Sequence, residues 1–168
     1  MKKAFLLIGG NIGDRLYHLT QAKKLIEQDC GHIVICSSVY ETAAWGKTDQ
    51  PSFLNQVLII QTRLDAFSLL NAILKIETSM GRKRMEKYDA RTIDIDILYY
   101  ESEQMNIESL NIPHPKISER RFVLTPLAEL APDMIDPCHR KSIKVLLAEC
   151  PDTLDVHVFN IQNADNQT

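Results

Sequence analysis

The chain has 168 residues, of which 45% are hydrophobic and 24% are charged, and its formal net charge is −3. This length and composition suit one globular domain, expected over residues 1–160, with a frayed tail over 161–168. The negative net charge argues against general nucleic-acid binding. The N-terminal apolar run ends after Ile8, too early for a signal peptide, and no other stretch approaches the about 20 apolar residues of a membrane span.

The cysteines show neither the spacing of a zinc site nor that of a small disulfide scaffold. They are Cys30, Cys36, Cys138 and Cys150, and no two of them form a Cys-x-x-Cys pair. We therefore expect reduced thiols and a cytoplasmic protein.

Apolar periodicity predicts the following elements in chain order. Strands are expected at about 3–8, 32–40, 53–62 and 92–99. Helices are expected after Asp14, ending near Gly31, and after the N-cap candidate Asp65, ending at Gly81; shorter ones are expected at 125–130 and 142–149. The order strand, helix, strand, strand, helix, strand predicts an α+β, ferredoxin-like fold: an antiparallel sheet with helices packed on it.

Three glycines in "LIGGNIGDRL" lie between the first strand and the first helix. Their spacing matches neither the dinucleotide fingerprint nor the P-loop, which also requires a lysine. We interpret Gly9, Gly10 and Gly13 as a tight turn that leads into the helix.

The segment "RTIDIDIL" places two aspartates in an otherwise apolar strand. Strand alternation puts Asp94 and Asp96 on the face of Thr92, and isoleucines on the other face. Two carboxylates about 5 Å apart repel by about 3 kcal/mol at an effective dielectric near 20. Either water on an exposed sheet face or one or two magnesium ions offsets this repulsion.

The basic segment "RKRMEKYDAR" directly precedes the aspartates. Arg82, Arg84 and Arg91 present planar guanidinium groups that suit phosphate oxygens. Such a cluster alone is more often a solvated loop, but beside paired aspartates it favours a nucleotide polyphosphate.

Three further groups are weaker candidates when taken alone. His114 is held between two prolines, which suits binding of a phosphate oxygen, although a lone histidine in a turn usually has no such role. Arg120 is followed by Arg121 and Phe122, and this pair of arginines suits a helix surface equally well. Phe53 and Asn55 share one strand face and suit a flat heteroaromatic ring, the alternative being a core phenylalanine and an edge asparagine.

The segments "IGGN", "DQPSFLN", "GRKR", "ARTIDIDIL", "IPHP" and "ERRFVLTPLAELAP" occur in this order. With them, the chain resembles the 6-hydroxymethyl-7,8-dihydropterin pyrophosphokinase family from the "IGGN" turn to about Leu130. Members transfer the terminal diphosphate of ATP to a pterin alcohol in folate biosynthesis and release AMP. The resemblance implies a Mg²⁺-dependent diphosphotransferase with ATP as co-substrate.

The resemblance also implies site residues. Asp94 and Asp96 would hold two Mg²⁺ ions and, with Arg82, Arg84 and Arg91, form the catalytic group, Arg82 and Arg84 lying on a loop that closes over the site. The ATP-binding residues would be Glu77, Arg82, Arg84, Arg91, His114 and Arg120. The pterin-binding residues would be Thr42, Trp45, Phe53, Asn55 and Phe122.

The chain departs from the family's usual pattern at Tyr88 and Asp89, where tryptophan and glycine are common, at Phe53, where tyrosine is common, and at Pro115, where an aromatic residue also occurs. All metal and phosphate candidates are retained, so we expect an active, monomeric enzyme that binds ATP and the hydroxymethyl pterin but neither nucleic acid nor membrane. The alternatives are a ferredoxin-like RNA- or nucleotide-binding module without catalysis, and a kinase that transfers one phosphoryl group and releases ADP.

Overall fold

The computed structural model describes residues 1–44, 49–82 and 90–161. In chain order its elements are β1 (Lys2–Gly10), α1 (Arg15–Asp29), β2 (His32–Cys36), β3 (Tyr40–Thr42), β4 (Phe53–Thr62), α2 (Ala66–Ser79), β5 (Asp94–Tyr100), β6 (Met105–Ile107), β7 (Leu110–Ile112), the 3-10 turn η1 (Ile117–Glu119), α3 (Arg121–Leu130), α4 (Ile143–Glu149) and β8 (Val156–Val158). In these three ranges, no helix has both the length and the apolar character required to cross a bilayer.

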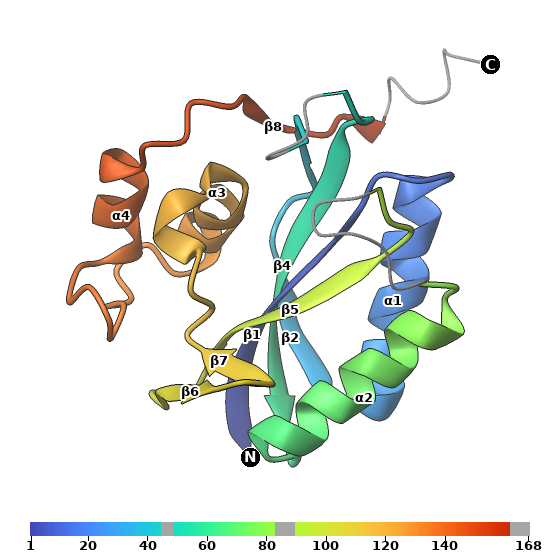
Figure 1. Cartoon of the computed structure of the whole chain (residues 1–168), viewed down its shortest axis with the longest axis horizontal. Coiled ribbons are helices and arrows are strands. Elements are labelled where there is room, and N and C mark those ends of the chain that lie inside the picture. The colour runs from blue at the N-terminus through green and yellow to red at the C-terminus, as the bar shows by residue number, and fades with distance from the viewer. Residues whose placement is uncertain (45–48, 83–89, 162–168) are drawn as a thin grey trace.

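The main sheet has the strand order β5-β1-β4-β3-β8 within the described residues, and β2 also pairs with β4. Its strand pairs are antiparallel. With β2 and β3 counted as one interrupted strand, the central order is the fourth, first, third and second strand, as in a ferredoxin-like fold. The predicted α+β class is confirmed, and β1 and β4 occupy the centre of the sheet (Figure 1).

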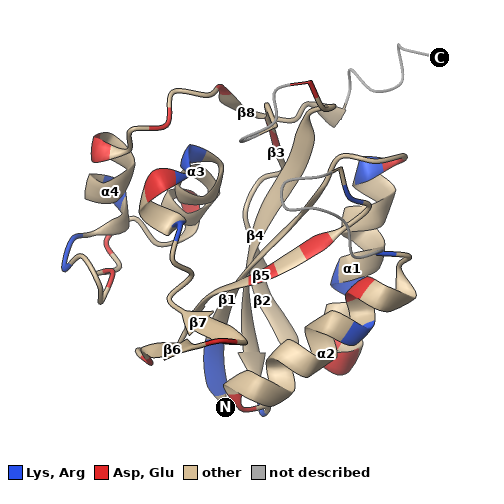
Figure 2. Cartoon of the chain, in the orientation of Figure 1, with Lys and Arg blue, Asp and Glu red and all other residues tan. Residues whose placement is uncertain are grey.

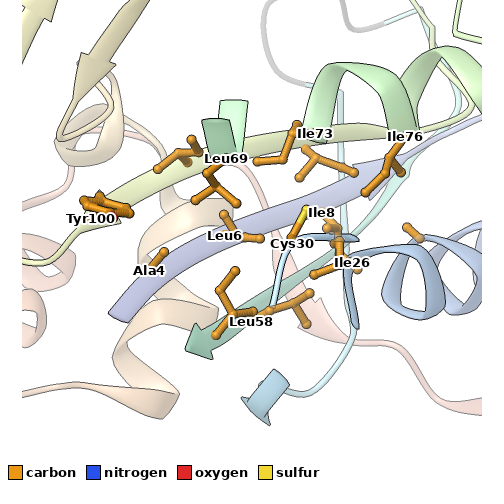
Figure 3. Close-up of a cluster of buried hydrophobic side chains, with 14 of the residues drawn as sticks. Ala4, Leu6, Ile8, Ile26, Cys30, Leu58, Leu69, Ile73, Ile76 and Tyr100 are labelled. Carbon is orange, nitrogen blue, oxygen red and sulfur yellow. The ribbon is translucent and has the colours of Figure 1, made fainter. Parts of the chain in front are cut away.

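Helices cover both faces of this sheet (Figure 1). On one face, α1 and α2 enclose a cluster that includes Leu6 and Ile8 of β1 and Leu69 and Ile73 of α2 (Figure 3). On the other face, α3 and α4 cover Leu7 and its neighbours. Because each face is covered, the residues of the central strands are buried almost throughout rather than alternating between buried and exposed.

Aspartate side chains begin the two long helices. The Asp14 carboxylate accepts a 3.0 Å hydrogen bond from the Tyr17 backbone N–H, and Asp65 accepts one of 2.8 Å from Ser68. Each bond satisfies a backbone donor that has no partner inside the helix. The predicted N-cap at Asp65 is therefore confirmed.

The single strand predicted at 32–40 is wrong, because the chain forms β2 and β3 with an interruption between them. At the interruption, the Ser37 hydroxyl accepts from the Val57 backbone N–H at 3.0 Å, while the Ser37 N–H donates to the Val57 carbonyl at 2.9 Å. A side-chain oxygen thus replaces a backbone acceptor, so the ladder breaks without leaving the Val57 N–H unsatisfied.

The helix predicted to begin at 125 instead begins at Arg121 and continues through Pro126. Its first turn is fixed by the Asp152 carboxylate, which accepts from the Arg121 backbone N–H at 3.1 Å. The burial of Leu124 and Leu127 also favours the longer helix. Strands β6, β7 and β8 were not predicted, because each has three residues, too few to show the two-residue alternation of apolar and polar side chains.

A buried carboxylate fastens the segment between α3 and α4 to the sheet. Asp136 is 1% exposed and accepts hydrogen bonds from the Tyr99 hydroxyl at 2.5 Å and from the backbone N–H groups of Cys138 and His139 at 2.9 and 2.7 Å. Burial by itself raises the pKa of Asp136, but the hydrogen bonds from the Tyr99 hydroxyl and from the backbone and ring of His139 lower it overall. The ionised form therefore stabilises the fold.

We predict that Asp136→Asn lowers the free energy of unfolding at pH 7 by about 1 to 3 kcal/mol, because an amide cannot replace a carboxylate that accepts from several donors. The folded-state pKa is lowered, so this stabilisation is present above the unfolded pKa and is lost as the pH falls through the folded value. Urea unfolding at pH 7 and pH 3 measures the effect. Asp133→Asn, on the same segment but exposed, is the control, and a wild-type-to-variant gap that does not narrow at pH 3 contradicts the assignment.

Candidate active site

Two aspartates lie side by side on β5, on the face covered by α3 and α4. Asp96 is paired with Leu7 of β1, and Asp94 is paired with Gly9. Ile95, between them, is buried in the cluster on the opposite face. The predicted alternation is therefore confirmed, and Figure 2 shows the resulting acidic stretch on β5.

Two arginines neutralise Asp94 from opposite sides. Arg82 Nη1 lies 2.7 Å from Asp94 Oδ1, and Arg91 Nη1 lies 2.9 Å from Asp94 Oδ2. Arg82 also pairs with Glu77 of α2. Glu77 is 3% exposed, and its other oxygen accepts from the Ile95 backbone N–H at 3.2 Å. The end of α2 and the start of β5 are thus joined through charges.

The negative charge of Asp96 is only partly compensated by the neighbouring arginines. Burial, followed by the charge of Asp94, raises the pKa of the Asp96 carboxyl to about 7. The guanidinium groups of Arg120, Arg82 and Arg91 act in the opposite direction but do not reverse the shift. A cation placed between the two carboxylates would relieve this unfavourable burial of charge.

The chemistry of these donors fits magnesium. Within the described ranges, no three His, Cys, Asp or Glu side chains gather into a metal cluster. Two hard carboxylates on one strand face suit an ion that takes one or two protein oxygens and completes its shell with water and phosphate. Asp94 and Asp96 are the residues that could hold it.

His114 is a neutral hydrogen-bond donor near these charges. Its backbone N–H donates to the Leu98 carbonyl of β5 at 3.0 Å. Burial lowers the pKa of His114 to about 4, with Arg120 acting in the same direction and Asp94 opposing it. Because Nδ1 accepts a 3.2 Å hydrogen bond from the Lys116 backbone N–H, the proton of the neutral ring is on Nε2.

The described residues that are predicted to bind the pterin lie on the same face of the sheet as Asp94 and Asp96. Asn55 is paired with Gly9, and its Nδ2 donates to the Thr42 hydroxyl at 3.1 Å. Phe53 is paired with Thr42. From α3, Phe122 packs against the core on this face, and its ring lies 5.7 Å from the Arg120 guanidinium carbon. Two predicted site residues, Trp45 and Arg84, are outside the described residues, as are Tyr88 and Asp89.

The prediction that Gly9 and Gly10 form a turn is wrong, because both are the last residues of β1. A Cβ atom on Gly9 would lie 2.2 Å from Asn55 Oδ1, and one on Gly10 would lie 2.2 Å from the Thr92 carbonyl oxygen. Close approach of neighbouring groups therefore requires these glycines. Gly13 does lie in the turn before α1 and has a positive φ of 69°.

Sequence reasoning missed Asn11, which links the two halves of the site. Asn11 is 3% exposed and accepts from the Arg91 backbone N–H at 2.9 Å through its side-chain oxygen. Its amide nitrogen donates to the Pro51 carbonyl at 3.1 Å and to Gln50 Oε1 at 3.2 Å. The only available signal was the position of an asparagine directly after two strand glycines.

The fold and these contacts define a class of protein: a ferredoxin-like α+β domain with a paired-carboxylate, arginine-rich site at one end of its sheet. Comparisons with known proteins narrow the class. A family model described as 7,8-dihydro-6-hydroxymethylpterin-pyrophosphokinase (HPPK) matches residues 5–132. The chain belongs to this family.

Relatives and solved structures agree with the family match. A 2-amino-4-hydroxy-6-hydroxymethyldihydropteridine pyrophosphokinase from Methylorubrum extorquens is 43% identical over 136 residues, which cover 80% of this chain and 86% of the relative. One from Bacillus subtilis is 44% identical over 128 residues, covering 76% and 77%. A Plasmodium falciparum HPPK-DHPS structure has the same fold, with a TM-score of 0.73 at 18% identity over 88% of this chain, which spans only 45% of that longer one.

We predict that Gly9→Ala lowers the free energy of unfolding by about 1 to 3 kcal/mol, because the new methyl group displaces the Asn55 amide. The test is a double-mutant cycle with Asn55→Ala, measured by urea unfolding. In the Asn55→Ala background the same glycine substitution should cost less, since Oδ1 is gone. Equal costs in both backgrounds contradict this account of Gly9.

Proposed function

We propose that this chain transfers the terminal diphosphate of ATP to the hydroxymethyl group of 6-hydroxymethyl-7,8-dihydropterin and releases AMP. The observation that carries the proposal is the pair Asp94 and Asp96, with Arg82 and Arg91 in contact with Asp94. A site for diphosphate transfer needs acidic groups for a metal and cationic groups for phosphate, and both are present within a few ångströms. Family membership supports the same reaction; no observation favours the non-catalytic binding module.

In this proposal, Asp94 and Asp96 would hold two Mg²⁺ ions, which would neutralise charge on the phosphates and lower the pKa of the pterin hydroxyl. Arg82 and Arg91 now bond to Asp94 and would transfer part of their contact to ATP oxygens. Such an exchange keeps each guanidinium paired with and without substrate. Arg84 is proposed to act with them.

Glu77, His114 and Arg120 complete the nucleotide side. His114, with its proton on Nε2, donates a hydrogen bond to a phosphate oxygen without changing charge near neutral pH. Arg120 adds a fixed positive charge beside Asp96. Glu77 acts by positioning Arg82. Transfer then depends on alignment and charge stabilisation rather than on a strong side-chain base.

The pterin is proposed to bind between Phe53 and Phe122, whose rings offer stacking surfaces. Asn55 has the paired donor and acceptor that suit an amide-like ring edge, and the hydroxyl of Thr42 fixes the orientation of that amide. Trp45 is also proposed to contribute to pterin binding. We further propose that the enzyme acts as a cytoplasmic monomer whose partners are ATP and the pterin, without nucleic acid or membrane.

We predict that incubation with ATP, Mg²⁺ and 6-hydroxymethyl-7,8-dihydropterin yields AMP and the pterin diphosphate in equal amounts. The reason is that the family's reaction moves the two terminal phosphoryl groups together. Ion-exchange separation of the nucleotides is the measurement, and omission of the pterin or addition of EDTA is the control. Formation of ADP instead would indicate single phosphoryl transfer and overturn the proposal.

We predict that Asp96→Asn lowers kcat by more than about a hundredfold, because an amide is a poor ligand for Mg²⁺ and leaves transition-state charge uncompensated. The fold should remain, and the free energy of unfolding without metal should not fall, since the neutral amide removes repulsion with Asp94. Steady-state kinetics and urea unfolding measure the two effects. Near-normal turnover by this variant would reject Asp96 as a metal ligand.

A further inference from the structure

An ion pair lies directly behind the residues proposed to bind the pterin. Glu41 is the middle residue of β3, so its side chain leaves the strand on the face opposite to Tyr40 and Thr42. There Arg15 Nη1, from the first residue of α1, lies 2.7 Å from Glu41 Oε2. The two side chains are only 24% and 25% exposed, so this pair is less screened by water than a fully exposed one.

The same arginine also contacts the chain just before β4. Arg15 Nη1 donates a 2.9 Å hydrogen bond to the backbone carbonyl of Ser52, the residue before Phe53. One guanidinium therefore holds both β3, which carries Thr42, and the start of β4, which carries Phe53. These are two of the residues proposed to contact the pterin.

Strand β8 and the residues after it also contact the Arg15–Glu41 ion pair. β8 pairs with β3, with His157 opposite Glu41, and His157 Nε2 lies 3.5 Å from Glu41 Oε1. The Phe159 backbone N–H donates to the Val39 carbonyl at 2.8 Å. The centre of the Phe159 ring lies 5.7 Å from the Arg15 guanidinium carbon. This segment follows residue 132, where the family match ends.

We propose that Arg15 and Glu41, braced by β8, are positioning residues for the pterin end of the site. This inference rests on the proposed function. β3 has only three residues, and its place beside β4 depends on few backbone hydrogen bonds. Loss of the ion pair lets β3 and the residue before Phe53 move independently, which weakens the pterin pocket. Of the described residues on β5 and α2, at the nucleotide end, none is hydrogen-bonded or ion-paired to Arg15 or Glu41, so we expect that end to stay in place.

The test is the substitution Glu41→Gln in the full chain, with kinetics measured separately against each substrate. The KM for the pterin should rise roughly fivefold, because a partly buried ion pair contributes about 1 kcal/mol and 1.4 kcal/mol corresponds to tenfold. The KM for ATP and kcat should stay within about twofold. A general loss of stability would instead lower the apparent kcat by reducing the folded fraction, and thermal unfolding is recorded to detect it.

Four variants serve as comparisons. Glu149→Gln makes the same chemical change in an ion pair with the same 2.7 Å separation, to Lys141, but on α4, away from the site; it should leave both KM values unchanged. Arg15→Gln should reproduce the effect of Glu41→Gln, and the double variant should add little to either. Arg15→Lys, which keeps the charge, should restore most of the affinity for the pterin.

The outcomes separate this inference from the proposed function. Wild-type release of AMP with an increase confined to the KM for the pterin supports both. Wild-type release of AMP with an unchanged pterin KM in Glu41→Gln, or with equal increases for pterin and ATP, overturns the positioning role alone. Failure of the wild type to release AMP overturns the proposed function, and the positioning role with it.

Discussion

Two carboxylates on one face of a buried strand are the constraint on which the rest of the site depends. The charges of Asp94 and Asp96 repel each other where little water can screen them. Burial and the charge of Asp94 together raise the pKa of Asp96. Arg82 and Arg91 offset part of this cost by pairing with Asp94. The charge of Asp96 is therefore only partly compensated by the described residues, which suits the metal and polyphosphate proposed to bind there.

The two ends of the site are built with different interactions. At the end proposed to bind the nucleotide, charged side chains such as Glu77 and Arg82 join α2 to β5, so their geometry depends on electrostatics. At the other end, Asn55 and Thr42 are fixed by neutral hydrogen bonds between neighbouring strands. Asn11 connects them by holding the backbone of Arg91 on one side and the Gln50–Pro51 segment on the other. Under the proposed function, this division would let separate groups on one sheet recognise the two substrates.

Much of the fold and the chemistry of β5 could be predicted, because periodicity is a local property. The alternation around Asp94 follows from two residues per repeat, and Asp65 follows from the preference for acceptors at helix starts. The interruption between β2 and β3 could not be predicted, since it depends on the Ser37 hydroxyl meeting a backbone N–H of β4. Gly9 was misassigned for the same reason: its requirement comes from Asn55, which is distant in sequence.

The sequence by itself determined the α+β class, the face on which Asp94 and Asp96 lie, and the family resemblance, because short-range pattern and residue type carry this information. Tertiary structure alone decided that Asn11 ties the site together and that β8 pairs with β3. It also decided which charges meet, such as Arg15 with Glu41. These contacts join residues far apart along the chain, and their energies depend on burial and distance, neither of which exists until the sheet has formed.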